Sequence, residues 1–246
     1  MDNAIYVGLS RQMMLERELD IVANNLANVD TNGFKFEDLI SSADKVSTPR
    51  AGGPSQALTF VQDGGVARDY SQGAFTQTGG PLDVAIDGKG FFQISTASGT
   101  RYTRDGRFKL DSTGKLVTQD GDPVQGAGGD IQIDPTKGQV SIAKNGVISQ
   151  SGNQVGKLQV VSFDSLAALS KDGANLFENV SNVTPTPSTD AVLEQGMLEG
   201  SNVQPINQIT RLIEINRAYD AITTMMSQTS SLSTTAIQRL GAVNPS

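Results

Sequence analysis

The chain has 246 residues, a formal net charge of −7, no cysteine and no histidine. The two missing residue types exclude thiol nucleophiles, Ser–His–Asp triads and the usual zinc sites. The acidic balance, with no basic stripe, argues against a nucleic-acid partner, because phosphate binding needs clustered Lys and Arg. Apolar residues make up 37% of the chain and glycine contributes 26 residues, which is typical of a turn-rich, partly β protein.

The first predicted element is an amphipathic helix from about Asp2 to Val29. Leu15, Leu19, Val22, Leu26 and Val29 recur at helical spacings of four and three, and Ile5 and Leu9 lie upstream at an interval of four. Beside this stripe lie Asn24, Asn25 and Asn28. A buried asparagine in a coiled coil sets register at some cost in stability. The alternative for these asparagines is a polar helix end that is solvated.

The middle of the chain has a different pattern. Residues 36–72 combine proline, glycine and scattered polar residues, which predicts an extended connector. Over 73–180, short β-branched and aromatic runs alternate with turn pairs, which are strong hairpin signals. These pairs are Asp87-Gly88, Asp105-Gly106, Asp120-Gly121 and Asn145-Gly146. We predict a small antiparallel barrel or sandwich over 73–180, and a second connector over 181–199.

The last predicted element is a helix from about Pro205 to Leu240, and proline suits the first turn of a helix. Its apolar face includes Leu212, Ile215, Ala218, Tyr219, Ile222, Met225, Met226, Leu232 and Ala236. The terminal segments 1–35 and 200–246 have no other apolar surface to cover, so the simplest solution is to pack them together. The predicted fold class is α+β, with paired, coiled-coil-like terminal helices and an inserted antiparallel β domain.

The candidates for chemistry are weak. Gly88-Lys89-Gly90 resembles the start of a dinucleotide loop but lacks the third glycine and the following helix. Asp120-Gly121-Asp122 lacks the spacing and the closing glutamate of a calcium loop. Asp83 and Asp87 are better interpreted as solvated carboxylates than as an acid–base pair, because nothing in the sequence indicates burial or a nearby pocket. We therefore predict no enzyme activity, no catalytic residue, no metal, no cofactor and no small-molecule substrate.

Targeting signals are equally sparse. No apolar run approaches the roughly 20 residues that a membrane span needs, and no cleavable signal peptide is recognisable. We expect no membrane insertion, and a protein that is cytosolic or that leaves the cell by a route without such a signal.

The two apolar stripes have two possible roles, and the sequence leaves both open. They form either the core of a helical hairpin or a seam shared with other subunits. One partner helix and a small barrel cannot cover all sides of an N-terminal rod roughly 40 Å long. The candidate assembly residues are Leu9, Leu15, Leu19, Val22, Asn24, Asn25, Leu26, Asn28, Leu212, Ile215, Tyr219, Ile222, Met225 and Leu232.

Several motifs resemble bacterial flagellar rod and hook proteins, in family order and over nearly the whole chain. The first is Ala23-Asn24-Asn25-Leu26-Ala27-Asn28, followed by Thr31 and Gly33-Phe34-Lys35. The stretch from Thr78 to Phe92 is similar to the next family signature, and Tyr102–Gly106 and Gly121–Gly126 continue it. The C-terminal signature is matched by Leu198–Val203 and Arg217-Ala218-Tyr219.

The resemblance implies a structural subunit of the flagellar basal-body rod, the torque-transmitting axial shaft that crosses the periplasm. The implied partners are proximal and distal rod subunits and the flagellar type III export apparatus, without a cleaved signal peptide. The opening Met1–Val7 resembles the proximal-rod branch more than the distal-rod branch. The alternatives are the distal-rod branch, a secreted glycan-binding or hydrolytic β-domain protein, and a soluble monomer with a helical hairpin.

Overall fold

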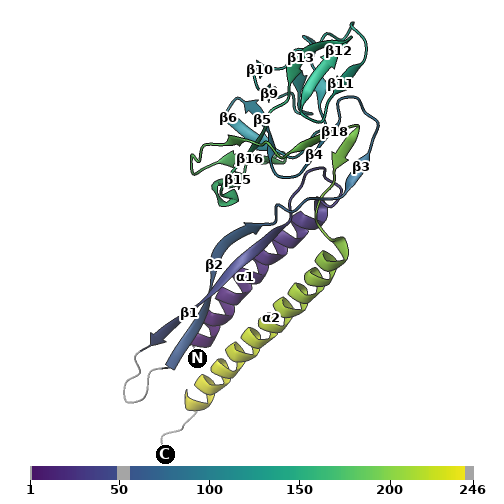
Figure 1. Ribbon diagram of the computed structural model, residues 1–246. Helices are drawn as coiled ribbons and strands as arrows, with labels where there is room; N and C mark the ends of the chain where they lie inside the picture. Colours follow the sequence, from purple (N-terminus) through teal and green to yellow (C-terminus); the bar gives the residue numbers. More distant parts are fainter. Residues whose placement is uncertain (1, 49–55, 242–246) are drawn as a thin grey trace, which may run out of the picture. The chain divides into compact units, whose positions relative to one another are not determined.

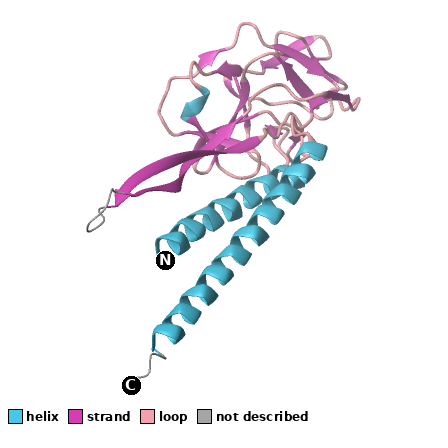
Figure 2. Ribbon diagram, turned by 90° about the horizontal axis from the view of Figure 1, so that it is seen from below, coloured by secondary structure: helices cyan, strands magenta, loops and turns pink. Residues whose placement is uncertain are grey.

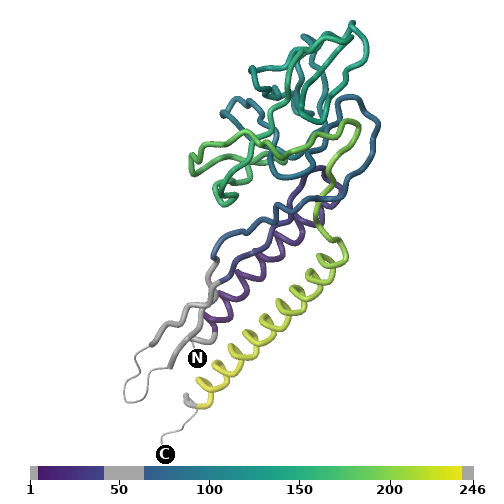
Figure 3. The backbone as a smooth tube through the Cα atoms, viewed as in Figure 1, coloured from purple at the N-terminus to yellow at the C-terminus, as the bar shows by residue number. Residues whose placement is uncertain are grey.

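The computed structural model describes residues 2–48 and 56–241, and the chain folds into two compact units (Figure 1). The helical unit comprises Met1–Ala27, Glu37–Asp69 and Gln204–Ser246, and the β unit comprises Asn28–Phe36 and Tyr70–Val203. The tube in Figure 3 follows the chain from the first helix, through the β unit, into the last helix.

The helical unit is built on α1 (Asp2–Ala27) and α2 (Pro205–Gly241), which lie side by side and antiparallel (Figures 1 and 2). Leu15, Val22 and Ile215 are buried between the two helices. Around them pack Leu19, Leu212, Ala218, Tyr219 and Ile222. The predicted terminal helices and their pairing are confirmed, and the predicted α+β class with them.

The helical unit also contains a hairpin of β1 (Glu37–Thr48) and β2 (Gln56–Arg68), which packs on α1. Figure 2 shows α1 between this hairpin and α2. The register shifts where Ile40 lies opposite Gly64 and Gly65, and Gly65 has a φ of +103°. Such a bulge inserts an extra residue and bends the strand. The sequence predicts an extended connector over 36–72, whereas the structure pairs most of this range as strands.

The β unit is antiparallel and centres on β5, which pairs with β6, β9 and β14. Its main sheet has the order β10-β9-β5-β6-β16-β15, with β14 and β17 branching from β5. The strands are β3 (Phe75–Gln77), β4 (Val84–Asp87), β5 (Phe91–Thr96), β6 (Gly99–Thr103), β7 (Lys109–Leu110), β8 (Leu116–Val117), β9 (Val124–Gly126), β10 (Gly129–Asp130), β11 (Val140–Ile142), β12 (Val147–Gln150), β13 (Asn153–Lys157), β14 (Val160–Ser162), β15 (Leu169–Lys171), β16 (Leu176–Asn179), β17 (Thr186–Pro187), β18 (Val192–Gln195) and β19 (Met197–Glu199), with a 3-10 turn at Leu166–Ala168.

Two apolar clusters fill the β unit, one on each face of β5. Successive residues of a strand point to opposite faces, so Phe91 joins one cluster and Phe92 the other. Phe92 packs edge-on against Phe108 at 5.0 Å between ring centroids. Phe91 packs against Phe163 and Phe177. Both faces of the sheet are therefore covered from within the β unit.

The turn pairs have two different outcomes. Asn145-Gly146 joins β11 and β12 as a local hairpin, as predicted. Asp87-Gly88 ends β4, but β4 pairs with β18 from much later in the chain. The range 181–199, for which the sequence predicts a connector, supplies β17, β18 and β19. The β unit therefore extends beyond 73–180. Its last strands pair with β14, β4 and β3, and local sequence patterns do not predict such long-range pairing.

Candidate assembly surface

Most of the candidate assembly residues of the two helices pack on each other inside the helical unit. Leu15, Val22 and Ile215 are at most 5% exposed, while Leu19, Leu212, Tyr219 and Ile222 are half-buried around them. Gly8 lets the helices approach closely, because a Cβ on it would lie 2.9 Å from Met226 Cγ. We call the contact surface between the two helices the α1–α2 seam. On α2 this seam includes Met226, and Met225 lies beside it.

Polar contacts fix the register of the two helices. Gln12 Nε2 donates to the Tyr219 hydroxyl at 2.6 Å. Arg211 Nε donates to Glu18 Oε1 at 2.7 Å, and this carboxylate side chain is largely covered. The antiparallel order of these pairs means that each step forward along α1 matches a step backward along α2.

Asn25 is the most constrained polar residue of the helical unit, with an exposed fraction of zero. Its Nδ2 donates to the Glu37 carbonyl at 2.7 Å and to Gln208 Oε1 at 3.3 Å. Its Oδ1 accepts from the Glu37 backbone N–H at 3.0 Å. Buried polar groups need such partners, and losing one is costly. Asn25 thus joins α1, β1 and the start of α2, and in this conformation its side chain is not available to a neighbour.

The other candidate residues are placed differently. Asn24 is exposed, and Asn28 and Leu26 are half-buried, with Asn28 Oδ1 accepting from the Thr31 hydroxyl at 3.1 Å. Leu9 and Met225 are each 45% exposed, and Leu232 is 67% exposed. Among the candidates, these three apolar side chains present the most surface to solvent.

Sequence reasoning missed a further set of exposed apolar side chains on the same helices. On α1 they are Tyr6 and Met13, and on α2 they are Ile206, Ile209, Ile213 and Ile237. A signal for them exists in the sequence, because 6, 9 and 13, like 206, 209 and 213, recur at helical spacing. These rows lie off the α1–α2 seam, so each helix carries a second, uncovered apolar face.

A buried ion cluster in the β unit was also missed. Glu199 Oε1 contacts Lys35 Nζ at 2.5 Å and Glu199 Oε2 contacts Arg104 Nη1 at 3.0 Å, with all three side chains at most 5% exposed. Burial lowers the pKa of Arg104, and the Glu199 charge opposes that shift. Gly33 N–H donates to the Glu199 carbonyl at 2.7 Å. The cluster ties the segment after α1 to the segment before α2.

The weak candidates for chemistry do not assemble into a site. Asp87 and Asp120 are exposed, and Asp83 is engaged by the Thr78 hydroxyl at 2.6 Å. Two surface grooves, of about 410 and 440 Å³, contain at most one carboxylate each. Among residues 2–48 and 56–241 no acidic cluster has the makings of a metal site. In that same part of the chain no helix is both long and apolar enough to span a membrane.

Comparison with known proteins matches these features to one group. Family models match three parts of the chain: "Flagella basal body rod protein" at residues 5–35, "Flagellar hook protein FlgE/F/G D1 domain" at 85–150, and "Flagellar basal body rod FlgEFG protein C-terminal" at 194–239. These models cover most of α1, much of the β unit, and most of α2.

Full-length relatives agree. The chain is 52% identical to the flagellar basal-body rod protein FlgF of Caulobacter vibrioides, over 99% of this chain and 100% of that protein. It is 38% identical to FlgF of Mesorhizobium japonicum, over 98% and 99%. It is 35% identical to the flagellar basal-body rod protein FlgG of Bacillus subtilis, over 89% and 91%.

Proposed function

Because the chain belongs to the flagellar basal-body rod protein family, we propose that it is a proximal-rod subunit that works by packing, with no catalytic role. The rod is a shaft that must carry torque, so its subunits need extensive and stiff contacts. Two FlgF relatives, at 52% and 38% identity, rank above the FlgG relative at 35%. Together with the Met1–Val7 opening, this supports the proximal branch over the distal branch.

The observation that carries the proposal is the uneven distribution of exposed apolar side chains. Of the thirteen large apolar side chains exposed in the described part of the chain, ten lie in the helical unit. Fully burying one such side chain contributes about 1.5–3 kcal/mol. In a single copy these side chains stay in contact with water. Neighbouring subunits in a polymer would bury them and so stabilise the assembly.

We assign the contact residues to two roles. The residues at the α1–α2 seam, such as Leu15 and Ile215, shape the helical unit. The outward residues, Leu9, Met225 and Leu232, together with Tyr6, Met13, Ile206, Ile209, Ile213 and Ile237, face other rod subunits. Export through the flagellar export apparatus is part of the same proposal and is supported by the family resemblance.

Deletion of the gene, followed by electron microscopy of purified basal bodies, tests the function. We expect basal bodies that lack a complete rod and hook, and cells that do not swim. Expression of the wild-type gene in trans should restore both. Complete rods and hooks in the deletion strain would refute the proposal.

A further inference from the structure

Methionine is the main oxidisable residue type of this chain. The sequence has no cysteine, no tryptophan and no histidine, and it has six methionines. A methionine thioether takes up one oxygen atom from a peroxide to give the sulfoxide, and methionine sulfoxide reductases reverse the change. A peroxide that reaches this protein therefore acts first on its methionine sulfur atoms.

Four of the methionines form two adjacent pairs on the terminal helices, Met13-Met14 on α1 and Met225-Met226 on α2. Successive residues of a helix lie about 100° apart around its axis, so the two members of a pair meet different surroundings. Met13 is 63% exposed and Met14 is 5% exposed. Met225 is 45% exposed, whereas Met226 is half-buried, with its Sδ 3.1 Å from the position that a Cβ on Gly8 would take. Each pair thus has one outward and one covered thioether.

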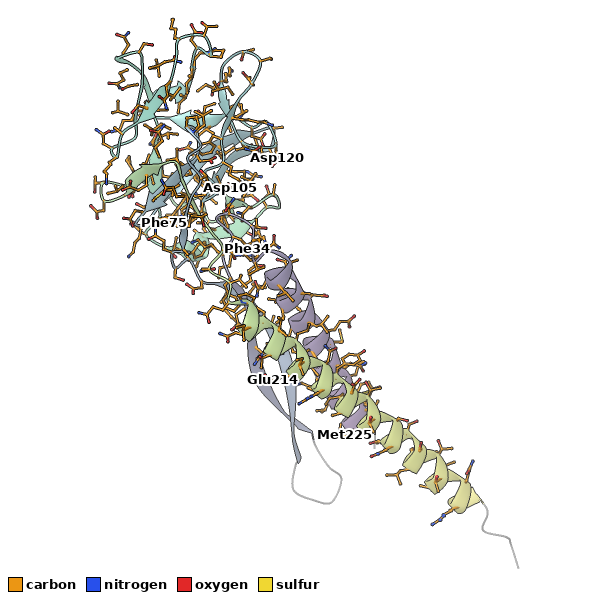
Figure 4. The ribbon with its side chains drawn as sticks, turned by 90° about the vertical axis from the view of Figure 1, so that its right-hand side faces the viewer. Phe34, Phe75, Asp105, Asp120, Glu214 and Met225 are labelled. Atoms are coloured by element: carbon orange, nitrogen blue, oxygen red, sulfur yellow. The ribbon has the colours of Figure 1, made fainter. Side chains whose placement is uncertain are left out.

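The outward member of each pair lies among the exposed apolar side chains of its helix. Met13 follows Tyr6 and Leu9 at steps of four and three, and these two are 63% and 45% exposed. Met225, which is labelled on α2 in Figure 4, lies about two turns before Leu232, so both project from the same side of α2. The unbranched methionine side chain is flexible and adapts to the shape of a partner. Both thioethers therefore suit the apolar contact with neighbouring subunits that the proposed function requires.

Oxidation changes such a contact in one step. The sulfur attacks one oxygen of hydrogen peroxide, the O–O bond breaks, and the proton on the transferred oxygen passes to the departing hydroxide, which becomes water. The sulfur is oxidised, the peroxide is reduced, and an apolar side chain has become a polar one. Burial of a polar group without a hydrogen bond is costly, so the oxidised face binds an apolar partner less tightly.

We propose that Met13 and Met225 are oxidation sites of the unassembled subunit, and that sulfoxide at these two positions blocks its addition to the rod. This inference rests on the proposed function, because it uses the outward apolar faces as contact surfaces. Met14 and Met226 are covered by the fold, so the single copy stays folded when the outward pair is oxidised. Reduction of the sulfoxides restores the apolar faces. A neighbour that covers Met13 and Met225 in the rod also protects them from oxidation.

Limited oxidation with hydrogen peroxide tests the sites. The purified full-length protein is treated for graded times, digested, and analysed by tandem mass spectrometry that separates neighbouring methionines. We expect sulfoxide to form several-fold faster at Met13 than at Met14, and several-fold faster at Met225 than at Met226. Equal rates within either pair, or faster oxidation of the covered member, would overturn the assignment of the sites.

The same treatment of intact basal bodies tests the contact. Met13 and Met225 should then oxidise several-fold more slowly than in the free protein, because neighbouring subunits cover them. Oxidation as fast as in the free protein would show that no subunit covers these thioethers, and sulfoxide there could not block assembly.

Substitution separates an effect on assembly from an effect on folding. Glutamine imitates the sulfoxide because it is polar and unbranched, leucine stays apolar without sulfur, and the two have similar helix propensities. Met13→Gln combined with Met225→Gln should give several-fold fewer basal bodies per cell than Met13→Leu combined with Met225→Leu. The two purified double variants should melt at the same temperature when followed by circular dichroism.

Two results would contradict the inference. Equal yields of basal bodies from the glutamine and leucine variants would show that a polar group at these positions does not block assembly. A lower melting temperature of the glutamine variant would place the two side chains in the core of the single copy. Both results are distinct from failure of the proposed function, which complete rods and hooks after gene deletion would show.

Discussion

The two units of this protein bury apolar surface in different ways. In the β unit, Phe91 and Phe92 send their rings into separate clusters, and both faces of the central sheet are covered by the same chain. In the helical unit, the buried apolar cluster between α1 and α2 centres on Leu15, Val22 and Ile215, and long apolar rows remain in solvent. A unit that completes its own core needs no neighbour to bury it, whereas a unit with exposed apolar rows buries more apolar surface when a neighbour covers them.

The largest expected effect lies in the β unit. Glu199→Ala leaves Lys35 and Arg104 buried without their carboxylate, which should reduce the free energy of unfolding by about 3–5 kcal/mol. Urea titration followed by circular dichroism measures this loss. Glu178→Ala is the control, because the Glu178 side chain is 44% exposed and pairs with Arg101 at 3.5 Å, and it should cost less than about 1 kcal/mol. Similar losses in both variants would show that the buried cluster does not hold the β unit together.

The second prediction separates the two apolar faces of α1. Leu15→Ala should destabilise the helical unit of the purified protein by about 2–5 kcal/mol, because it opens a cavity at the seam. Leu9→Ala removes a side chain that is already 45% exposed, so its effect on the same unfolding measurement should stay within about 0.5 kcal/mol.

The same pair of variants should differ in assembly. Leu9→Ala should leave the monomer folded and still reduce the number of rods per cell, counted by electron microscopy. Normal rods from the Leu9 variant would remove this part of α1 from the proposed contact surface. A loss of monomer stability as large as that of Leu15→Ala would show that Leu9 belongs to the core.

A smaller effect is expected at Asn25. Asn25→Ala deprives the Glu37 backbone and Gln208 of buried hydrogen bonds, and should cost about 1–3 kcal/mol. Hydrogen exchange at the start of β1 and at the first turn of α2 should rise together. Asp20→Ala, at an exposed position of α1, is the comparison and should change these rates little. Increased exchange confined to α1 would contradict a role for Asn25 in joining the three elements.

The smallest expected effect is a pH dependence of the β unit. The pKa of Asp111 lies below its usual value, because the Lys115 backbone N–H and then the Thr113 hydroxyl donate to its carboxylate. A carboxyl with a lowered folded-state pKa adds stability above its unfolded pKa of about 3.9, and this stability is lost as the pH falls through the folded value. Asp111→Asn should therefore show a slightly flatter fall in melting temperature on acidification. An unchanged acid profile would show that this turn does not contribute.

The pattern of the terminal segments was enough to predict both helices and their pairing. Leu15, Leu19 and Val22 on one segment, and Leu212, Ile215 and Tyr219 on the other, recur at spacings that a helix places on one face. The pair Asn145-Gly146 also predicts its hairpin, because that turn depends on the local residues alone. The motifs around Asn24 and Glu199 are sufficient by themselves to indicate the family, because they are short stretches of consecutive residues.

Tertiary structure alone decided which of two neighbouring faces became internal. Met225 and Met226 are the same residue type at adjacent positions, yet Met226 lies against Gly8. Met225, which is labelled on α2 in Figure 4, is 45% exposed. Contacts between distant residues likewise decided the pairing of β1 with β2, the pairing of β4 with β18 and the partners of Glu199. A repeat of three and four specifies an apolar face within one helix, but the partner of that face depends on what the rest of the chain, or the next subunit, places beside it.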